Sequence, residues 1–181
     1  MSLFLMILIV ALALWAVAIY NLLVRDKNRV LAAWSDIAVQ LKRRHDLIPK
    51  LVEVVQRYAG YERATLERVV TLRSQSEHVE AIAQKGRIES ELAGQLHRLI
   101  ALAEQYPDLK ASAHFLALQR DLSAVEDHIQ YARRYYNGAV RNLNIRVDSF
   151  PDLLIARLFG YRHAEYFQLD DANERHPARI D

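Results

Sequence analysis

The most apolar part of the chain is its first stretch. Residues 2–24 (SLFLMILIVALALWAVAIYNLLV) contain no charged residue, no glycine and no proline. At about 1.5 Å per residue, a helix of this length spans roughly 35 Å, which is enough to cross the hydrocarbon core of a bilayer. A helix buried inside a soluble core would need a larger domain around it. The pattern therefore predicts a transmembrane anchor over residues 1–24.

A cleaved secretory signal is the main alternative, because residues 16–18 (AVA) form a triplet typical of cleavage sites. No basic residue precedes the apolar run, however, and the run continues to Val24, so we favour a retained anchor. Three basic residues follow it directly, namely Arg25, Lys27 and Arg29. Because basic flanks stay on the cytoplasmic side, we expect the N-terminus outside and the rest of the chain in the cytoplasm.

After the anchor, apolar residues recur at spacings of three and four, as in a helix that packs on partner helices: Val30, Trp34, Ile37, Leu41, Ile48, Leu51, Val55 and Tyr58. Arg44 breaks this apolar stripe. Neither glycine nor proline precedes Pro49, so the anchor and this helix are predicted to be continuous. Pro49 lacks the amide that would bond the carbonyl of His45, so we expect a kink near residues 45–49.

Helical periodicity continues through the rest of the chain. Gly60 marks the first predicted turn, and a second rod runs from there to Tyr106-Pro107. Its apolar residues thin out over residues 74–86, so we expect an interruption there. A third rod begins near Lys110 and ends at Phe150-Pro151.

A short apolar helix over residues 152–159 follows, and the polar tail, residues 170–181, is predicted to be disordered. The fold class is therefore all-α, with an N-terminal transmembrane helix that continues into an antiparallel up-and-down helical bundle, four-helix-bundle-like, over residues 25–169. We expect the bundle to consist of three long rods, of which the second is interrupted. The short helix caps one end of the bundle or completes a fourth edge.

Charge and composition exclude several function classes. The chain has 24 basic and 22 acidic residues, interspersed, for a formal net charge of +2, so no broad basic face for nucleic acid is expected. It has no cysteine, and none of its histidines follows a glutamate by three residues, as di-iron bundles require. Zinc-protease, phosphate-loop and serine-hydrolase motifs are absent too. We therefore predict a protein that is not an enzyme and holds no metal or cofactor, with a hydrolase or metal enzyme as the remote alternative.

The segment His45-Asp46-Leu47-Ile48-Pro49 resembles the phosphoacceptor region of helical histidine kinases, but the chain contains no glycine-rich nucleotide-binding domain to phosphorylate it. A membrane-linked sensor or signalling module with a hinge at His45-Pro49 is thus the alternative function. The simpler interpretation is that residues 42–45 (KRRH) are mostly solvated and partly neutralised by Asp46. Arg44 then marks either a polar layer in the bundle or an exposed edge.

A pattern of tyrosine, valine and asparagine at offsets of zero, four and eight occurs twice, as Tyr20-Val24-Asn28 and as Tyr136-Val140-Asn144. These offsets place the three residues on one helical face, so both stretches could make similar lateral contacts. A buried asparagine at such a position must be hydrogen-bonded.

Several sequence blocks resemble the LemA family, a group of bacterial membrane-anchored helical proteins. The N-terminal block comprises Tyr20-Asn21, Asn28, residues 33–37 (AWSDI), residues 39–44 (VQLKRR) and residues 46–49 (DLIP). The C-terminal block comprises residues 106–111 (YPDLKA), Phe115-Leu116, Leu118-Gln119, Ala132-Arg133, Tyr136-Asn137 and Phe150-Pro151. Lys50 and Leu143 depart from the family pattern, which usually has asparagine and tyrosine there.

The resemblance implies a four-helix bundle anchored in the bacterial inner membrane, without established enzymatic activity. Relatives take part in building magnetosome membranes, and others occur beside a membrane zinc protease of the HtpX type. These associations favour a scaffold or adaptor that organises or recruits other membrane proteins or copies of itself. The candidate interaction residues are those that match the family motifs: Tyr20, Asn21, Asn28, Trp34, Asp36, Arg44, Asp46, Pro49, Pro107, Tyr136, Asn137, Asn144, Phe150 and Pro151.

Overall fold

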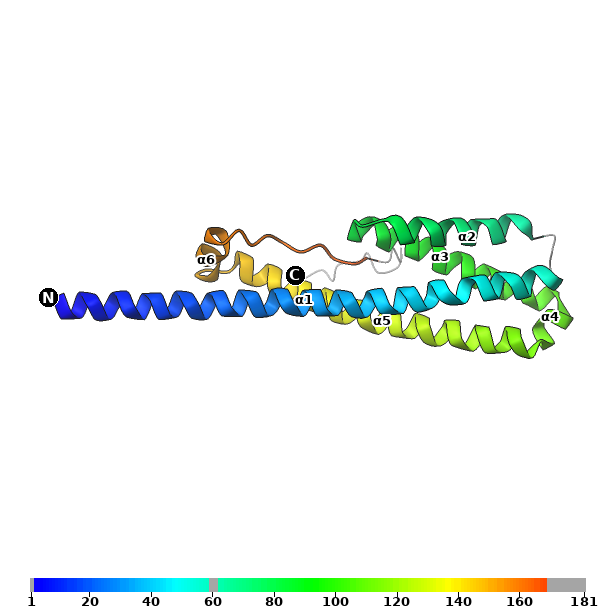
Figure 1. The fold of residues 1–181 in the computed structure, drawn as a ribbon, viewed down its shortest axis with the longest axis horizontal. Coiled ribbons are helices and arrows are strands. Elements are labelled where there is room, and N and C mark those ends of the chain that lie inside the picture. The colour runs from blue at the N-terminus through cyan, green and yellow to red at the C-terminus, as the bar shows by residue number, and fades with distance from the viewer. Residues whose placement is uncertain (1, 59–61, 169–181) are drawn as a thin grey trace, which may run out of the picture. The chain divides into compact units, whose positions relative to one another are not determined.

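The computed structural model describes residues 2–58 and 62–168, and within these ranges its regular structure is entirely helical (Figure 1). The elements are α1 (Ser2–Tyr58), α2 (Arg63–His78), α3 (Ile82–Leu102), the 3-10 turn η1 (Ala103–Gln105), α4 (Pro107–Ala111), α5 (Ala113–Asp148) and α6 (Asp152–Leu158). The all-α fold class is thus confirmed. The predicted turn at Gly60 and the predicted disordered tail over residues 170–181 lie outside the described residues.

Helix α1 contains 57 residues and runs without interruption from the apolar segment through Pro49. The predicted continuity of anchor and first soluble helix is therefore confirmed, whereas a kink near residues 45–49 stays a prediction. The helix is long and apolar enough to cross a membrane, and almost none of its most apolar stretch is buried. Such exposure would be unfavourable in water and is typical of a surface that faces lipid.

The chain divides into two compact units. We call residues 1–37 and 131–166 the anchor unit, and residues 38–130 and 167–181 the bundle unit. Each unit is described separately, since α1 and α5 contribute residues to both.

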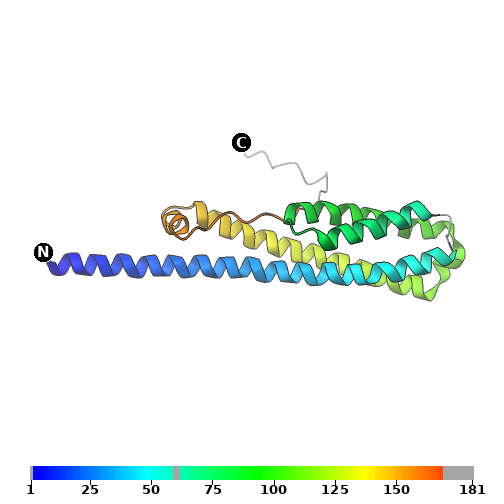
Figure 2. The same ribbon diagram turned by 45° about the horizontal axis from the view of Figure 1, so that its top comes forward.

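The bundle unit is built from the end of α1, α2, α3 and the start of α5, which lie alongside one another in both views (Figure 1 and Figure 2). Only residues 79–81 separate α2 from α3, and the two helices pack against each other. The predicted interruption of the second rod is thus confirmed, and it reverses the direction of the chain. Because the second rod is divided into the two helices α2 and α3, it supplies the fourth helix of the bundle. The short C-terminal helix α6, expected as a cap or fourth edge, belongs to the anchor unit instead.

Apolar side chains from all four helices form the core of the bundle unit. They recur at helical spacing on each element: Ile48, Leu51 and Val55 on α1; Leu66, Val69 and Leu72 on α2; Leu92, Leu96 and Leu99 on α3; Phe115, Leu118 and Leu122 on α5. Burial of such a core is the main favourable contribution to folding. The stretch around residues 79–81 has little apolar surface to add, so the chain turns there.

The anchor unit pairs the first part of α1 with the last part of α5. Its buried side chains come mainly from one stripe on each helix: Ile19, Leu23, Val30, Ala33 and Ile37 on α1, and Tyr136, Val140 and Leu143 on α5. Helix α5 ends at Asp148 and α6 starts at Asp152, so Phe150-Pro151 ends the third rod as predicted. The chain after α6 runs back along α5 (Figure 2).

Candidate functional site

The bundle unit contains a buried layer of charged side chains centred on Arg44. The Arg44 side chain is 1% exposed, and its guanidinium donates hydrogen bonds to the carboxylates of Glu89 on α3 and Glu126 on α5, the latter at 2.7 Å between Nη1 and Oε2. A backbone carbonyl, that of Glu89, lies 3.5 Å from Nη2. The polar residue in the apolar stripe of α1 therefore marks a polar layer, one of the two predicted alternatives.

Glu89 is the second centre of this layer and is completely buried. Its carboxylate also accepts hydrogen bonds from the Ser76 hydroxyl on α2 and from Nε2 of His45, which lies 2.7 Å from Oε1. Burial alone would raise the pKa of Glu89, but the His45 hydrogen bond, the Arg44 charge and the Ser76 hydroxyl outweigh it and lower the pKa from 4.5 to about 2.

We call these five residues the Arg44 layer: Arg44, His45, Ser76, Glu89 and Glu126. They come from α1, α2, α3 and α5, so the layer joins all four helices of the bundle unit. A buried ion pair gains little net stability because desolvation offsets the attraction, but an unpaired member would be costly. The arrangement therefore favours one register of the four helices over others.

His45 was expected to be mostly solvated, and this expectation is wrong: it is buried beside Arg44. Its imidazole is hydrogen-bonded to Glu89. A phosphoacceptor histidine needs an exposed imidazole with a free nitrogen. The backbone carbonyl of His45, freed by Pro49, accepts a hydrogen bond from Nε of Arg73 on α2 at 2.9 Å. This contact explains how α1 continues past a proline without leaving an orphaned buried acceptor.

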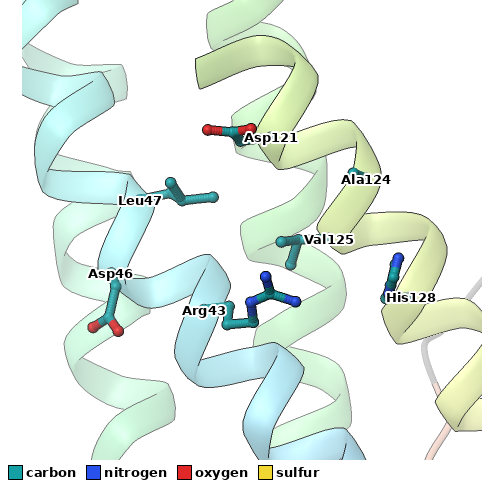
Figure 3. Close-up of a pocket in the computed structure, with 7 residues that line it drawn as sticks. All are labelled: Arg43, Asp46, Leu47, Asp121, Ala124, Val125 and His128. Atoms are coloured by element: carbon teal, nitrogen blue, oxygen red, sulfur yellow. The ribbon is translucent and has the colours of Figure 1, made fainter. Parts of the chain in front are cut away.

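A groove lies between α1 and α5 in the bundle unit, with a volume of about 380 Å³ (Figure 3). Arg43 and Leu47 on α1 point toward Asp121 and Val125 on α5, and His128 lies beside them. A second hollow of about 340 Å³ is lined by α3 and α5 and reaches Arg44. Both are open and carry scattered charges of both signs rather than a set of reactive groups aimed at one point. Within the described residues, no group of three or more histidine, aspartate or glutamate side chains could hold a metal ion.

In the anchor unit, α5 holds the chain that follows α6. The buried Tyr136 hydroxyl donates to the carbonyl of Glu165 at 2.8 Å. Burial, with a smaller effect of the Glu165 charge, raises the pKa of Tyr136 from 10.0 to about 12. Asn144 bonds the backbone of Ala164 twice: its amide nitrogen donates to the carbonyl at 3.0 Å, and its oxygen accepts from the amide at 2.8 Å.

The expectation that both copies of the tyrosine, valine and asparagine pattern make similar contacts holds only in part. Both tyrosines pair with another aromatic ring, Tyr20 with Phe159 and Tyr136 with Trp34. Asn28, however, is exposed, whereas Asn144 holds a neighbouring backbone. The difference arises because α5 has an extended segment beside this face, with backbone groups for the asparagine to bond.

A second ion cluster in the anchor unit joins three elements. Arg146 on α5 donates from Nε to Asp26 on α1 at 2.7 Å and from Nη1 to Asp152 at the start of α6 at 2.8 Å. Asp26 is buried. We name Asp26, Arg146 and Asp152 the Arg146 cluster, and it fixes the position of α6 against the other two helices.

Sequence reasoning missed most residues of both clusters. Glu89 lies three residues before the buried Leu92, and Asp26 lies three after the buried Leu23, so both occupy the register of the apolar stripes. This position in the apolar register was the sign in the sequence that Glu89 and Asp26 are buried. Their partners could not be inferred, because they lie on helices whose relative register the sequence does not specify.

Most other candidate residues taken from the family motifs lie apart from these clusters. Asp46 is exposed and pairs with Lys42 at 3.6 Å, which confirms partial neutralisation of the basic run. Asn137 and Pro151 are half-buried, and Trp34 packs on Tyr136. The remaining candidates are exposed: Asn21, Asp36, Pro49, Pro107 and Phe150.

Comparison with known proteins identifies the relatives of this chain. The LemA family matches residues 33–181. Protein LemA of Metamycoplasma hominis is 29% identical over 156 residues, covering 83% of this chain and 69% of that protein.

Two magnetosome proteins are similar as well. Magnetosome protein MamQ 2 of Paramagnetospirillum magneticum and magnetosome protein MamQ of Magnetospirillum gryphiswaldense are each 24% identical over 181 residues. These alignments cover 86% of this chain and 66% of either relative, so the chain spans about two thirds of their length. Together with the apolar length of α1, these similarities indicate a membrane-associated helical protein. The chain belongs to the LemA family.

Proposed function

We propose that this protein is a membrane-anchored, non-catalytic scaffold or adaptor that organises or recruits other membrane proteins at the bacterial inner membrane. The observation that carries the proposal is that the buried charged side chains of the bundle unit bond to one another. In the Arg44 layer, charged side chains bond to one another and join four helices, so they hold the bundle unit together and do not form a reactive site. Arg44 and Glu126 also line the open hollow between α3 and α5, but their charged groups bond to each other instead of converging on a point where a substrate could react.

The exposed face of α5 in the anchor unit supplies a surface of the kind that protein partners use. Tyr131 and Tyr135 are one helical turn apart, and they are 66% and 60% exposed. The guanidinium of Arg134 lies 4.7 Å from the ring centre of Tyr131. Tyrosine and arginine are enriched at the energetic centres of protein interfaces, so we assign partner binding to this Tyr131-Arg134-Tyr135 face.

Photo-crosslinking in intact membranes tests this proposal. A benzoylphenylalanine placed at Tyr135 should give specific adducts of higher mass, whereas the same probe at the exposed Leu116 on the bundle-unit part of α5 should not. Mass spectrometry then identifies the partner, with an HtpX-type protease and a second copy of this chain as the first candidates to check. Recovery of monomer alone from both positions would refute the scaffold proposal.

The proposed orientation has a separate test. Arg25, Lys27 and Arg29 follow the apolar segment, so we place the residues after it in the cytoplasm. The chain has no cysteine, which allows a single Ser74→Cys variant to be labelled at an exposed position of α2. A membrane-impermeant maleimide should label it in spheroplasts only after permeabilisation. Labelling of intact spheroplasts would reverse the assigned orientation.

The scaffold proposal also differs in its consequence from a sensor with a hinge at His45-Pro49. A scaffold needs His45 only as a hydrogen-bonding member of the Arg44 layer, so a His45→Gln variant that still folds should keep both its cellular function and the crosslinks made from Tyr135. A sensor that depends on modification of the imidazole should lose its cellular function in the same variant while its fold and crosslinks persist.

A further inference from the structure

Helix α6 and its flanks expose an unusual amount of apolar surface. Four large side chains are more than half exposed: Phe150 at 78%, Leu154 at 54%, Leu158 at 75% and Phe159 at 56%. Leu154 and Leu158 are one turn apart, so they share a face of α6, while Ile155 and Ala156 are buried. We call these four exposed residues the α6 surface. Such clustered apolar exposure is typical of a site that contacts a partner or a membrane.

Contacts within the anchor unit fix where the end of α6 lies along α1. The apolar segment of α1 gives way to charged residues between Val24 and Arg25. The ring of Phe159 lies 4.7 Å from that of Tyr20, on the apolar side of this boundary. The ring of Tyr161 lies 5.9 Å from Nζ of Lys27, on the charged side. The chain after α6 therefore passes across the boundary.

The start of α6 is joined through Arg146 to the charged side of the same boundary. Asp152 and Asp26 share the guanidinium of Arg146, at 2.8 Å and 2.7 Å. Tyr20 lies six residues before Asp26, which corresponds to about 9 Å along the axis of α1. Helix α6 and its flanks thus lie beside the stretch of α1 from Tyr20 to Asp26, where the apolar segment gives way to charged residues.

We infer that the α6 surface inserts into the interfacial layer of the lipid bilayer and forms a second membrane contact beside the spanning helix. This inference rests on the proposed membrane span of residues 2–24. Large apolar and aromatic side chains are favourable at this depth. Arg157 and Arg162 flank the surface and are exposed, so the preferred lipids carry anionic headgroups.

Fluorescence quenching in proteoliposomes tests the inference with the full-length chain. The absence of native cysteine allows single-cysteine variants that carry an environment-sensitive nitrobenzoxadiazole label: Leu158→Cys, with Leu14→Cys as the lipid reference and Leu116→Cys as the water reference. All three leucines are exposed, so labelling should not disturb the packing. In vesicles of phosphatidylethanolamine and phosphatidylglycerol, the Leu158 label should be quenched by spin-labelled lipid and protected from aqueous iodide, as at Leu14.

Each result decides between distinct possibilities. A Leu158 label that iodide quenches as it does at Leu116, while the Leu14 label stays in lipid, overturns the inference and leaves the membrane span intact. Protection of Leu158 from both quenchers means that protein covers the surface, which also overturns it. If the Leu14 label itself fails to contact lipid, the proposed membrane anchor fails first.

The headgroup preference has its own measurement. Replacing phosphatidylglycerol by phosphatidylcholine should reduce lipid quenching at Leu158 and leave it unchanged at Leu14, because only the former depends on Arg157 and Arg162. Equal quenching at Leu158 in both lipid mixtures would contradict the assignment of anionic headgroups.

Discussion

The two units of this protein use charged residues in opposite ways. In the bundle unit, Arg44 and Glu89 lie inside the four-helix core, fully removed from solvent. In the anchor unit, the Arg146 cluster lies nearer the surface, since Arg146 and Asp152 are partly exposed. The anchor unit instead exposes its large apolar side chains, first along residues 3–17 and again around α6.

The environments that we propose for the two units, water for the bundle unit and partly lipid for the anchor unit, account for this difference. A bundle in water buries its apolar residues and gains little net stability from buried ion pairs, so a charged layer there specifies register. A unit that contacts lipid gains nothing from hiding apolar side chains on the lipid side, and its polar contacts hold peripheral segments in place. The polar contacts of the bundle unit should therefore contribute more to stability than those of the anchor unit.

The largest effect is expected from Glu89→Ala in the bundle unit. Removing this carboxylate leaves Arg44 buried without its main partner, which should lower the free energy of unfolding by about 3–5 kcal/mol. The matched control is Glu91→Ala on the same helix, where the partner Arg68 is about half exposed and the loss should stay below about 1 kcal/mol. Chemical unfolding in detergent micelles, followed by circular dichroism, measures both.

A double variant separates the cost of an orphaned charge from the value of the pair. Arg44→Met combined with Glu89→Gln removes both charges, so it should be more stable than Glu89→Ala alone. If the double variant loses more stability than the single one, the layer contributes net attraction and our account of it as a register device is wrong.

Acid should weaken the bundle unit through the same carboxylate. The pKa of Glu89 is about 2 in the folded chain against the usual 4.5. On acidification, the folded state therefore takes up this proton at a lower pH than the unfolded state does. This contribution, about 3 kcal/mol, is fully present above pH 4.5 and is lost as the pH falls through 4.5 toward 2. Unfolding midpoints measured across this window should fall less steeply for Glu89→Gln than for the native chain. Parallel profiles would contradict the assignment.

Two glycines of α3 should respond with opposite signs to the same substitution. A Cβ on Gly86 would collide with the backbone carbonyl of Gln168, so Gly86→Ala should destabilise the bundle unit by about 1–3 kcal/mol. A Cβ on Gly94 meets no atom within 4 Å, so Gly94→Ala should stabilise the helix by about 0.5–1 kcal/mol. A thermal unfolding midpoint that rises for Gly86→Ala as it does for Gly94→Ala would show that residue 168 does not pack on α3.

A smaller loss of stability than in the Arg44 layer is expected in the anchor unit, from Asn144→Ala. It removes two hydrogen bonds to the backbone of Ala164 and should release that segment at a cost of about 1–2 kcal/mol. The matched control is Asn28→Ala in the other copy of the pattern, which is exposed and should change stability by less than about 0.5 kcal/mol. Amide hydrogen exchange of residues 161–166 reports the release directly. Equal exchange in both variants would mean that Asn144 does not hold the segment.

Helix positions were largely predictable because periodicity is a local property of the chain. The anchor, the third rod, the end at Phe150-Pro151 and the short helix after it all follow from apolar spacing and from proline. The break between α2 and α3 was also visible as a loss of apolar residues. The reversal of the chain there was not, because it depends on whether two short apolar faces can pack on each other rather than continue as one rod.

The sequence indicated polar contacts only where a residue departs from the regular apolar pattern of a helix. Arg44 stood out because it interrupts an apolar stripe, and the freed carbonyl of His45 followed from Pro49. That Glu89 and Glu126 would neutralise Arg44, and that Arg73 would bond the carbonyl, required knowledge of which helix faces meet. His45 was wrongly expected in solvent because its position next to three other basic residues hid the fact that its own face turns toward α2 and α3.

The sequence by itself determined the helical elements, the apolar anchor and the family, because these depend on residues that are neighbours along the chain. Only the tertiary structure decided which charges pair, which of two identical motif copies holds a backbone segment, and which apolar residues stay exposed around α6. These outcomes depend on the register of helices far apart in sequence, and register is set by the sum of many small packing energies that no local pattern records.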